Sequence, residues 1–495
     1  MAPDDPTADD SAGSSDRRTA IGPVLAPATD TTTTATRRTL LSRTGAISGA
    51  LATGLAGCLG LGGGGDDEEQ DGDYGGRQPT VTVEDPPNAV FLPTHREAMR
   101  VGEPVTAGEF RFVPMLSYPH PFWTIAGSDD AAVERETPDV GRGVHMMITV
   151  QDRETGLVVP VDDGIQFRIR SDGERVGSPV SPWAMLSQEM GFHFGDNVGL
   201  PGDGTYEVEV TIPPLSVRRT GALAGRGEER ATGTFEFEYD DEFRDQVIGE
   251  IDYLERDRWG ERGALEPMGA GADGGGGDGD GDDGGDRSEN DAGGNAEHES
   301  EMDHAHVPYA TVPAVDAYAG TRLVGDASAG ADGEETAAAE LPRSDDAPIV
   351  AVLFEADADT DESDLTRLAG DENRTQNPEQ YLLVSPRTPY NRVPLPDAAL
   401  TASIERDGDL VVEHELEQTL DSEYGHHYGV VVSGTGSDTS DSESSSAIRS
   451  GDSVTVSVDS PPQVARHQGY ETAFLEMEAV TFEVPDGAEG GDTGN

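Results

Sequence analysis

Apolar and polar residues alternate with a period of two over much of the central and C-terminal parts of the chain. In 206–210 and 235–239 every second residue is apolar, and carboxylates occupy most of the positions between. Such alternation is typical of strands with one buried and one solvated face. Asp-Gly pairs at 172–173 and 407–408 follow two of these runs and favour tight hairpin turns. The pattern therefore predicts an all-β protein made mainly of antiparallel strands.

The strand pattern occurs twice in the same order. A hairpin run over 159–176 recurs over 393–411, and the Gly-Phe-His-Phe-Gly string at 191–195 recurs as Gly-His-His-Tyr-Gly at 425–429. A Pro-Pro segment at 213–221 recurs at 461–469, and a closing strand at 234–237 recurs at 481–484. Four matches in one order indicate a duplication. Each copy is expected to form an antiparallel β-sandwich, and the Ser/Asp/Gly-rich insertion at 434–447 is expected to be a surface loop.

One segment between the copies has helical rather than strand periodicity. Phe243, Val247, Ile248, Ile251 and Leu254 recur at helical spacing and predict one amphipathic helix over 243–254. A Gly/Asp-rich tract follows and predicts a solvated linker. The expected order is a signal with a lipobox at 1–58, a disordered tether at 59–80, a metal-binding sandwich at 81–242, a helical connector at 243–268, a disordered acidic linker at 269–304, a second, divergent sandwich at 305–486 and a disordered tail at 487–495.

The charge of the chain restricts its partners. The 495 residues include 97 acidic and 33 basic side chains, none of them lysine, and the formal net charge is -64. No basic surface is available to displace phosphate counterions, which excludes nucleic-acid binding. Because carboxylates also cover the solvent faces of predicted strands, the composition resembles that of proteins from extreme halophiles. The acidity then reflects the solvent rather than the ligand.

The N-terminal residues have the features of an export signal. Arg37 and Arg38 precede a short stretch of small and apolar residues at 44–57, which ends in Leu-Ala-Gly before Cys58. This order resembles a twin-arginine signal joined to a lipoprotein processing box, and it predicts a chain anchored by lipid to the outer face of the cytoplasmic membrane. Cys58 is the only cysteine. Its lipidation would leave no thiol for disulfides or thiolate metal sites.

The string at 190–198, Met-Gly-Phe-His-Phe-Gly-Asp-Asn-Val, continues to Tyr206 and resembles the signature of the periplasmic ferrous-iron-transport-associated protein family. Arg466 and His467, followed by Gly-Tyr-Glu-Thr at 469–472, resemble the Arg-His segment of that family. The resemblance covers 144–239 and, less closely, 381–484. It implies immunoglobulin-like sandwiches, often dimeric, that bind iron(II) or copper. It also implies a membrane iron permease or redox partner that receives the ion.

The first copy contains histidines and methionines suited to such a site. His145 and Met147 share one face of a predicted strand, so both side chains could reach one ion. The resemblance implies a carboxylate where Met147 stands, and a thioether there favours Cu(I) over harder ions. The family methionine would align with Leu186, so Met185 and Met190 are both open as ligands. The predicted metal set is His145, Met147, Met185, His193, His427 and His467, with His120, Met190 and His426 as further candidates.

Neither copy contains the complete ligand set that the resemblance implies. The first copy has Arg218 and Arg219 where the family has Arg-His. The second copy keeps His427 and His467, but the strand aligned with His145 offers only Glu379 or Gln380. One hypothesis is that two sandwiches pair, within a chain or in a homodimer, and complete a site across their interface.

Other interpretations of these residues stay open. Met146 and Met190 are also typical of core filling, and His193 of a buried, hydrogen-bonded histidine. The His- and acid-rich stretch at 297–306 could gather metal loosely. No Gly-X-Ser-X-Gly, phosphate-binding loop or His-Glu-X-X-His motif is present in the sequence, so no enzymatic activity is predicted. The alternative function is a structural or protein-interaction lipoprotein with degenerate metal ligands.

Overall fold

The structure, a computed structural model, describes residues 81–127, 133–138, 142–160, 164–268, 307–325, 341–355, 364–373, 380–432 and 447–486. The predicted export signal with Cys58, the tether, the linker at 269–304, most of the insertion at 434–447 and the tail lie outside these residues. Neither helix in the described part of the chain has the length and apolar character needed to cross a membrane.

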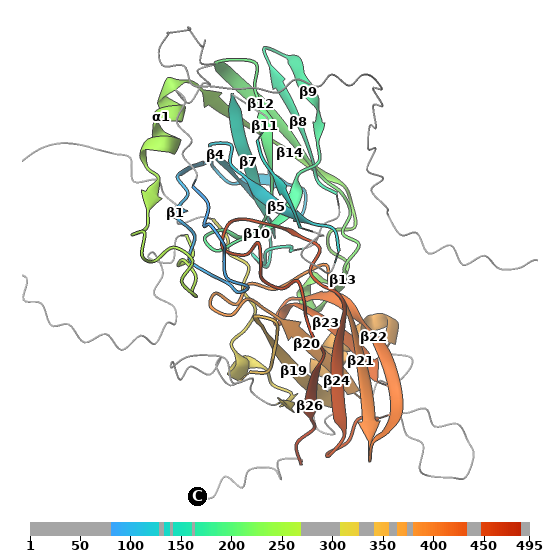
Figure 1. Cartoon of the computed structure of the whole chain (residues 1–495). Coiled ribbons are helices and arrows are strands. Elements are labelled where there is room, and N and C mark those ends of the chain that lie inside the picture. Colours follow the sequence, from blue (N-terminus) through green and yellow to red (C-terminus); the bar gives the residue numbers. More distant parts are fainter. Residues whose placement is uncertain are drawn as a thin grey trace, which may run out of the picture. The chain divides into compact units, whose positions relative to one another are not determined.

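The first sandwich consists of two layers of strands (Figure 1). One layer has the order β2-β4-β7-β11-β10-β25-β5-β6, with β3 beside β4, and the other has the order β14-β12-β8-β9. The bounds of the first layer are β2 (Met99–Val101), β3 (Val105–Ala107), β4 (Phe110–Ser117), β5 (Phe122–Ile125), β6 (Val133–Glu136), β7 (Gly143–Asp152), β10 (Trp183–Ser187), β11 (Gly191–Gly199) and β25 (Ala465–Arg466). Those of the second layer are β8 (Gln166–Ser171), β9 (Glu174–Val180), β12 (Gly204–Ile212) and β14 (Ala231–Tyr239). A separate ribbon pairs β1 (His95–Arg96) with β15 (Asp252–Tyr253).

The second sandwich repeats this plan, except that one long strand, β22, pairs with strands of both layers. Its strands follow the order β16-β19-β20-β23-β22-β21-β24-β26-β17, with β13 beside β22 and β18 beside β19. Their bounds are β13 (Arg218–Thr220), β16 (Thr321–Arg322), β17 (Val324–Gly325), β18 (Arg343–Ser344), β19 (Ala347–Glu355), β20 (Gln380–Pro386), β21 (Ala399–Arg406), β22 (Asp409–Asp421), β23 (Gly425–Val432), β24 (Ser453–Ser460) and β26 (Val480–Glu483). The first half of β22 pairs with β21, and from Glu417 onward it pairs with β23.

Apolar residues from both layers of each sandwich form its core. Phe192 and Phe194 of β11 pack in one cluster with Val208 and Val210 of β12. In the second sandwich, Leu382 of β20 packs in one cluster with strands of the opposite layer. On β12 and β14, Glu207, Glu236 and Glu238 alternate with buried apolar residues and are exposed. The all-β prediction is confirmed.

The two Asp-Gly turns are also confirmed. Asp172 and Gly173 have φ values of 51° and 79°, and Asp407 and Gly408 have 53° and 83°. Two successive positive φ values are typical of type I′ hairpins, whose twist matches that of the flanking strands. The closing strands of the two copies, β14 and β26, lie where the repeat predicts them. The run predicted from Val159 becomes a strand only at Gln166, the first residue of β8.

The predicted helix is shorter than expected. Helix α1 (Asp241–Gly249) begins after Asp240, whose side chain accepts a hydrogen bond from the Phe243 backbone N–H. It ends at Gly249, whereas the prediction extended it to Leu254 and was wrong there. Glycine is a weak helix former, and the edge of β1 offers the next residues a strand partner, so they form β15. A second helix, α2 (Asp364–Asn373), was not predicted.

Each sandwich contributes one short strand to the sheet of the other. Strand β25 pairs in parallel with β10, with Ala465 opposite Met185. Strand β13 pairs in parallel with β22, with Arg218 opposite Thr419. In Figure 1 the red segment that contains β25 runs beside β10 of the first sandwich. This exchange carries residues near the C-terminus into the first sandwich.

Buried Arg466 holds the exchanged C-terminal segment in shape. It is fully buried, and its guanidinium donates to the carbonyl oxygens of Tyr470 at 3.3 Å and of Pro462 and Phe474 at 3.4 Å, and also to that of Ala473. A buried guanidinium is costly unless its N–H groups are paired. These backbone contacts fix the loop that presents the neighbouring His467.

Candidate metal centre

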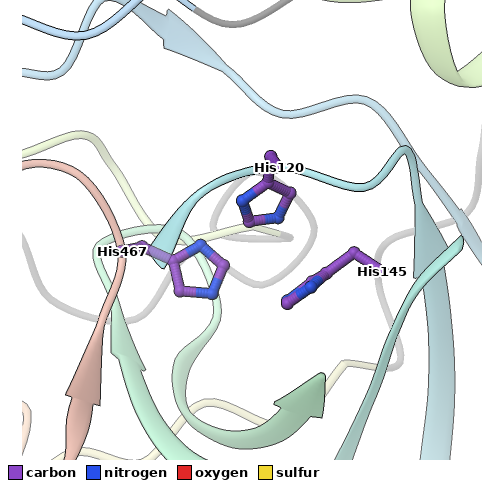
Figure 2. A group of neighbouring side chains, drawn as sticks. All are labelled: His120, His145 and His467. Carbon is purple, nitrogen blue, oxygen red and sulfur yellow. The ribbon is translucent and has the colours of Figure 1, made fainter. Parts of the chain in front are cut away.

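Three histidines from distant parts of the sequence meet on the face of the first layer that points away from the sandwich core, since Met146 and Ile148, which alternate with His145 and Met147 on β7, belong to that core. His120 lies between β4 and β5, His145 lies on β7, and His467 follows β25. One ring nitrogen from each lies within 4.8 Å of the others, and Figure 2 shows the three rings around one common space. Their exposed fractions are only 2%, 0% and 4%. Buried imidazoles this close can bind one transition-metal ion.

A fourth histidine lies against this group. The Nε2 atom of His193 on β11 is 3.1 Å from the Nε2 atom of His467, and His193 is fully buried. Two nitrogen ligands of one tetrahedral ion lie about 3.3 Å apart when each is about 2.0–2.1 Å from the metal. The separation of the two nitrogens therefore suits two ligands of one ion.

Hydrogen bonds determine which nitrogens of this pair carry protons. His193 Nδ1 is 3.2 Å from the carbonyl oxygen of Gly191, and His467 Nδ1 is 2.9 Å from Oε1 of Glu97. Both oxygens can only accept, so both Nδ1 atoms donate and both Nε2 atoms present lone pairs. Burial lowers the pKa of His193 to about 3, and burial also lowers the pKa of His467. Two facing lone pairs repel each other, and a bound cation would remove that repulsion.

His145 is oriented in the same way by an amide. Its Nδ1 atom lies 3.1 Å from Oδ1 of Asn197. The His120 backbone N–H donates to this same oxygen at 3.2 Å, and Asn197 Nδ2 donates to the His120 carbonyl at 2.9 Å, which fixes the amide orientation. The Nε2 atom of His145 is buried and has no hydrogen-bond partner. Metal-bound histidines typically donate their other N–H to such an oxygen. Burial and the nearby histidines hold the pKa of His145 well below its usual value.

Glu97 connects two of the histidines and was not identified from the sequence. Its Oε1 accepts from His467 Nδ1 at 2.9 Å, and its Oε2 lies 3.3 Å from His120 Nε2. Burial alone would lower the pKa of His120, but the charge of Glu97 and a hydrogen bond to it raise that pKa. The Glu97 side chain is 16% exposed, more than the His120 or His467 side chain it contacts. A metal that binds His120 would displace a proton held against this carboxylate.

Gly195 leaves space beside the histidines. A Cβ atom at this position would lie 3.1 Å from His145 Nε2, 3.1 Å from Met147 Cγ and 3.2 Å from Met185 Sδ. The φ of Gly195 is not positive, so its backbone does not require glycine. The missing side chain instead leaves room between an imidazole and two thioether side chains. Thioethers are soft ligands and favour Cu(I).

Six of the predicted ligands lie at or beside this centre, and three lie elsewhere. His120, His145, His193 and His467 are grouped together, with Met147 and Met185 next to them. Met190 lies in a neighbouring apolar cluster, and Met146 belongs to the main core. His426 and His427 lie on β23 of the second sandwich. Glu97 has no motif around it, so no signal in the sequence singled it out, whereas Asn197 lies within the string at 190–198 and was not recognised as a partner of a ligand.

The expected alignment of the second copy with His145 is wrong. On β11, Asn197 lies four residues after His193 and opposite His145. On β23, Val431 lies four residues after His427 and opposite Tyr381. Tyr381 is therefore the counterpart of His145, whereas Gln380 lies opposite Val432 and Glu379 lies outside the described residues.

A family model described as a domain of unknown function, DUF7350, matches residues 320–483. No curated protein matches the chain. Among solved structures, a copper-bound variant of FetP from uropathogenic Escherichia coli is similar, with 20% identity and a TM-score of 0.22, covering 29% of this chain and 97% of that one. FetP of the same organism, as isolated, is similar with 19% identity and a TM-score of 0.20, covering 29% of this chain and 96% of that one.

Proposed function

We propose that this chain is an extracytoplasmic metal-binding protein that holds one copper or ferrous ion among His120, His145, His193 and His467 and passes it to a membrane permease. The observation that carries the proposal is the pair of facing Nε2 atoms, 3.1 Å apart, on His193 and His467. Both rings have already committed Nδ1–H to an oxygen. A buried arrangement of unshared lone pairs is unfavourable without a cation and favourable with one.

The ligand types support copper ahead of iron. Imidazole binds copper, iron and zinc, and divalent copper binds such sites more tightly than divalent iron. The thioethers of Met147 and Met185 beside Gly195 extend the preference to Cu(I). Glu97 contacts His120 and His467 through its two carboxylate oxygens and is placed to take part in binding.

Titration of the full chain with divalent ions tests the binding step. Anaerobic Fe²⁺ and aerobic Cu²⁺ are each added in molar potassium salt against a competing chelator, and copper is also observed by electron paramagnetic resonance. We expect one tight ion per chain, nitrogen hyperfine structure from imidazoles, and tighter binding of Cu²⁺. Copper held by surface carboxylates has oxygen ligands and lacks that signature.

A pair of histidine variants makes the test specific. His467→Ala removes a ligand, and we expect it to weaken Cu²⁺ binding by more than about 100-fold, beyond the effect of losing a supporting hydrogen bond. His414→Ala changes a partly buried histidine of β22 outside the centre and should leave the affinity unchanged. Absence of a stoichiometric ion, or equal affinities of the wild type and His467→Ala, would refute the proposal.

The location and the delivery step rest on the N-terminal sequence. Arg37, Arg38 and Cys58 support export by the twin-arginine route and lipid anchoring on the outer face of the cytoplasmic membrane. A lipid anchor would hold the metal centre beside a membrane permease. Cys58→Ser should release the protein from the membrane fraction, and cellular uptake of the ion should fall in that strain and in a His467→Ala strain. Unchanged uptake in both strains would contradict the delivery step.

For the second sandwich, we propose the alternative function, a structural role with degenerate ligands. Tyr381 stands in the place of His145, and its hydroxyl lies 3.0 Å from His427 Nε2. His427 Nδ1 lies 3.1 Å from the Gly425 carbonyl oxygen, so the tyrosine is the donor to Nε2. This imidazole is satisfied without an ion, which supports one metal centre per chain.

A further inference from the structure

A cluster of methionines adjoins the histidine centre, and only one of its members, Met147, enters the function proposed above. Met99, Met115, Met147 and Met190 are at most 1% exposed and pack together, and Met268 is partly buried against them. We call these five residues the methionine cluster. Val113 and Val307 belong to the same buried apolar cluster.

The strand register connects the methionine cluster with the histidine centre. Met115 on β4 lies opposite Met147 on β7, and Met147 lies opposite Gly195 on β11. Directly opposed residues have Cβ atoms about 4.5–5.5 Å apart, within contact of long side chains. Because Met147 also borders the space beside Gly195, it belongs to both groups. Thioethers therefore extend from the histidines toward partly buried Met268.

The second sandwich shows that the fold does not require methionine at these positions. Val352 lies opposite Leu383, and Leu383 lies opposite Gly429, so Val352 and Leu383 are the counterparts of Met115 and Met147. Tyr424 precedes Gly425 as Met190 precedes Gly191, and the two glycines have matching φ values of 65° and 64°. The three counterparts pack in an ordinary aliphatic and aromatic cluster.

Methionine therefore gathers on the side of the molecule where the histidines converge. Methionine is often an adaptable filler of cores. A filler role alone does not explain why one copy uses several methionines where the other copy packs valine, leucine and tyrosine. Neutral, soft sulfur ligands suit a monovalent soft ion, whose burial costs less than that of a divalent ion.

We propose that the methionine cluster is a second metal position, specific for a soft monovalent ion of the Cu(I) class, with Met268 on the side from which the ion enters. The proposal rests on the proposed function, because it takes the histidine centre as the neighbouring position. An ion bound by the thioethers can move to the histidine centre through Met147, which borders both. No electron transfer is needed, since the ion keeps its valence.

Silver ion tests the second position without redox chemistry. The full chain, labelled with carbon-13 in its methionine methyl groups, is titrated with Ag⁺ in molar potassium nitrate, because chloride would precipitate silver. We expect two Ag⁺ per chain, with the methyl signals of Met99, Met115 and Met190 shifted during one of the two binding steps. Binding of one Ag⁺ only, or unshifted signals of these three methionines at saturation, would overturn the proposal.

A triple variant separates the two positions. Met99→Leu, Met115→Leu and Met190→Leu together should lower the Ag⁺ stoichiometry from two to one and leave Cu²⁺ binding unchanged. Leucine is close to methionine in volume and equally apolar, so the triple variant should still fold. The matched control, Met146→Leu, alters a fully buried methionine of the main core and should retain two Ag⁺. Two Ag⁺ in the triple variant would refute the second position.

The two proposals can fail separately. Loss of the Ag⁺ signal at the methionine cluster with normal Cu²⁺ binding would refute the second position and leave the histidine centre standing. Equal Cu²⁺ affinity in the wild type and His467→Ala would refute the histidine centre, whatever the methionine signals show.

Discussion

The two sandwiches share a sheet plan but fill the same space in opposite ways. In the first, Gly195 leaves room between His145 and two methionines. In the second, a Cβ atom on Gly429 would lie 2.1 Å from the Tyr381 hydroxyl, so the tyrosine occupies that space. Its hydroxyl satisfies the buried imidazole of His427.

The two exchanged strands, β13 and β25, also differ in whether the polar side chains at their ends are satisfied by hydrogen bonds. Following the register, Thr220 of β13 lies opposite Asp421 and donates to its carboxylate at 2.7 Å. By the same register Ala465 is the counterpart of Arg218, so the counterpart of Thr220 is His467, which meets His193. The predicted match of Arg218 and Arg219 with Arg466 and His467 is therefore wrong by one residue. Thr220, at the end of β13, is therefore held by a hydrogen bond to a carboxylate. His467, after β25, instead faces His193 with an unshared lone pair. The glycine and the histidine of the repeated motif therefore do not make a metal centre by themselves. The residues placed over them decide.

The largest expected difference is between the two repeated histidines. We expect His193→Ala to weaken Cu²⁺ binding by more than about 100-fold, because it removes a ligand rather than a supporting contact. His427→Ala should leave Cu²⁺ affinity unchanged and lower stability, because it leaves the buried Tyr381 hydroxyl without its partner. Competition with a chelator and urea unfolding measure the two effects. Similar losses of affinity in both variants would mean that the second sandwich also binds the ion.

The next largest effect on Cu²⁺ affinity is expected when the space beside Gly195 is filled. Gly195→Ala places a methyl group among His145, Met147 and Met185, and overpacking of this kind costs about 1–3 kcal/mol. If the overpacking destabilises only the metal-bound state, Cu²⁺ affinity falls roughly 10- to 100-fold. Gly249→Ala is the matched control, since a Cβ atom there meets nothing within 4 Å. Full affinity in Gly195→Ala, measured by the same competition, would show that the ion lies elsewhere.

A smaller effect is expected from the amide that orients His145. Asn197→Val introduces the residue that the second copy has at this position, Val431, and removes the acceptor for His145 Nδ1. We expect about a 10-fold weaker Cu²⁺ affinity, since the imidazole itself remains. Asn197→Asp keeps an acceptor oxygen and should retain most of the affinity. Equal affinities of the valine variant and the wild type would contradict an orienting role.

Substitution of His426 is expected to have the smallest effect on Cu²⁺ affinity and a separate effect on the stability of the protein. This side chain is 2% exposed, both ring nitrogens have no hydrogen-bond partner, and burial lowers its pKa to about 3. Its counterpart in the first copy is Phe192. His426→Phe should not change Cu²⁺ affinity, and above pH 6.5 it should add about 1–3 kcal/mol of stability by removing unpaired buried nitrogens.

The pH dependence of that gain follows from the lowered pKa. Between pH 6.5 and about 3 the unfolded chain protonates His426 while the folded chain does not, so wild-type stability falls as the pH falls. The contribution is about 1.4 kcal/mol per pH unit. The advantage of His426→Phe should therefore grow from pH 6 to pH 4 in urea unfolding. A constant difference over this range would show that His426 is protonated in the folded protein.

Much of the fold could be predicted because its signals are local. The Asp-Gly turns, the alternation in β12 and β14 and the order of the repeat all depend on neighbouring residues. The end of α1 at Gly249 could not be predicted from apolar spacing, since Ile251 and Leu254 continue the helical period while the edge of β1 draws the chain into β15. The parallel pairs of β25 with β10 and of β13 with β22 join segments far apart in sequence and leave no periodic pattern.

The residues alone indicated the type of chemistry: histidine and methionine in one repeat, no thiol beyond Cys58, and His145 and Met147 on one strand face. Which of these residues meet depends on how the strands pair in the folded chain. His467 reaches its partners by strand exchange, and the contact with Glu97 spans 370 positions of the chain. Metal ligation requires atoms to converge within a few ångströms. Periodicity specifies which face a side chain occupies, whereas convergence depends on how distant strands pair and on what fills the space between them.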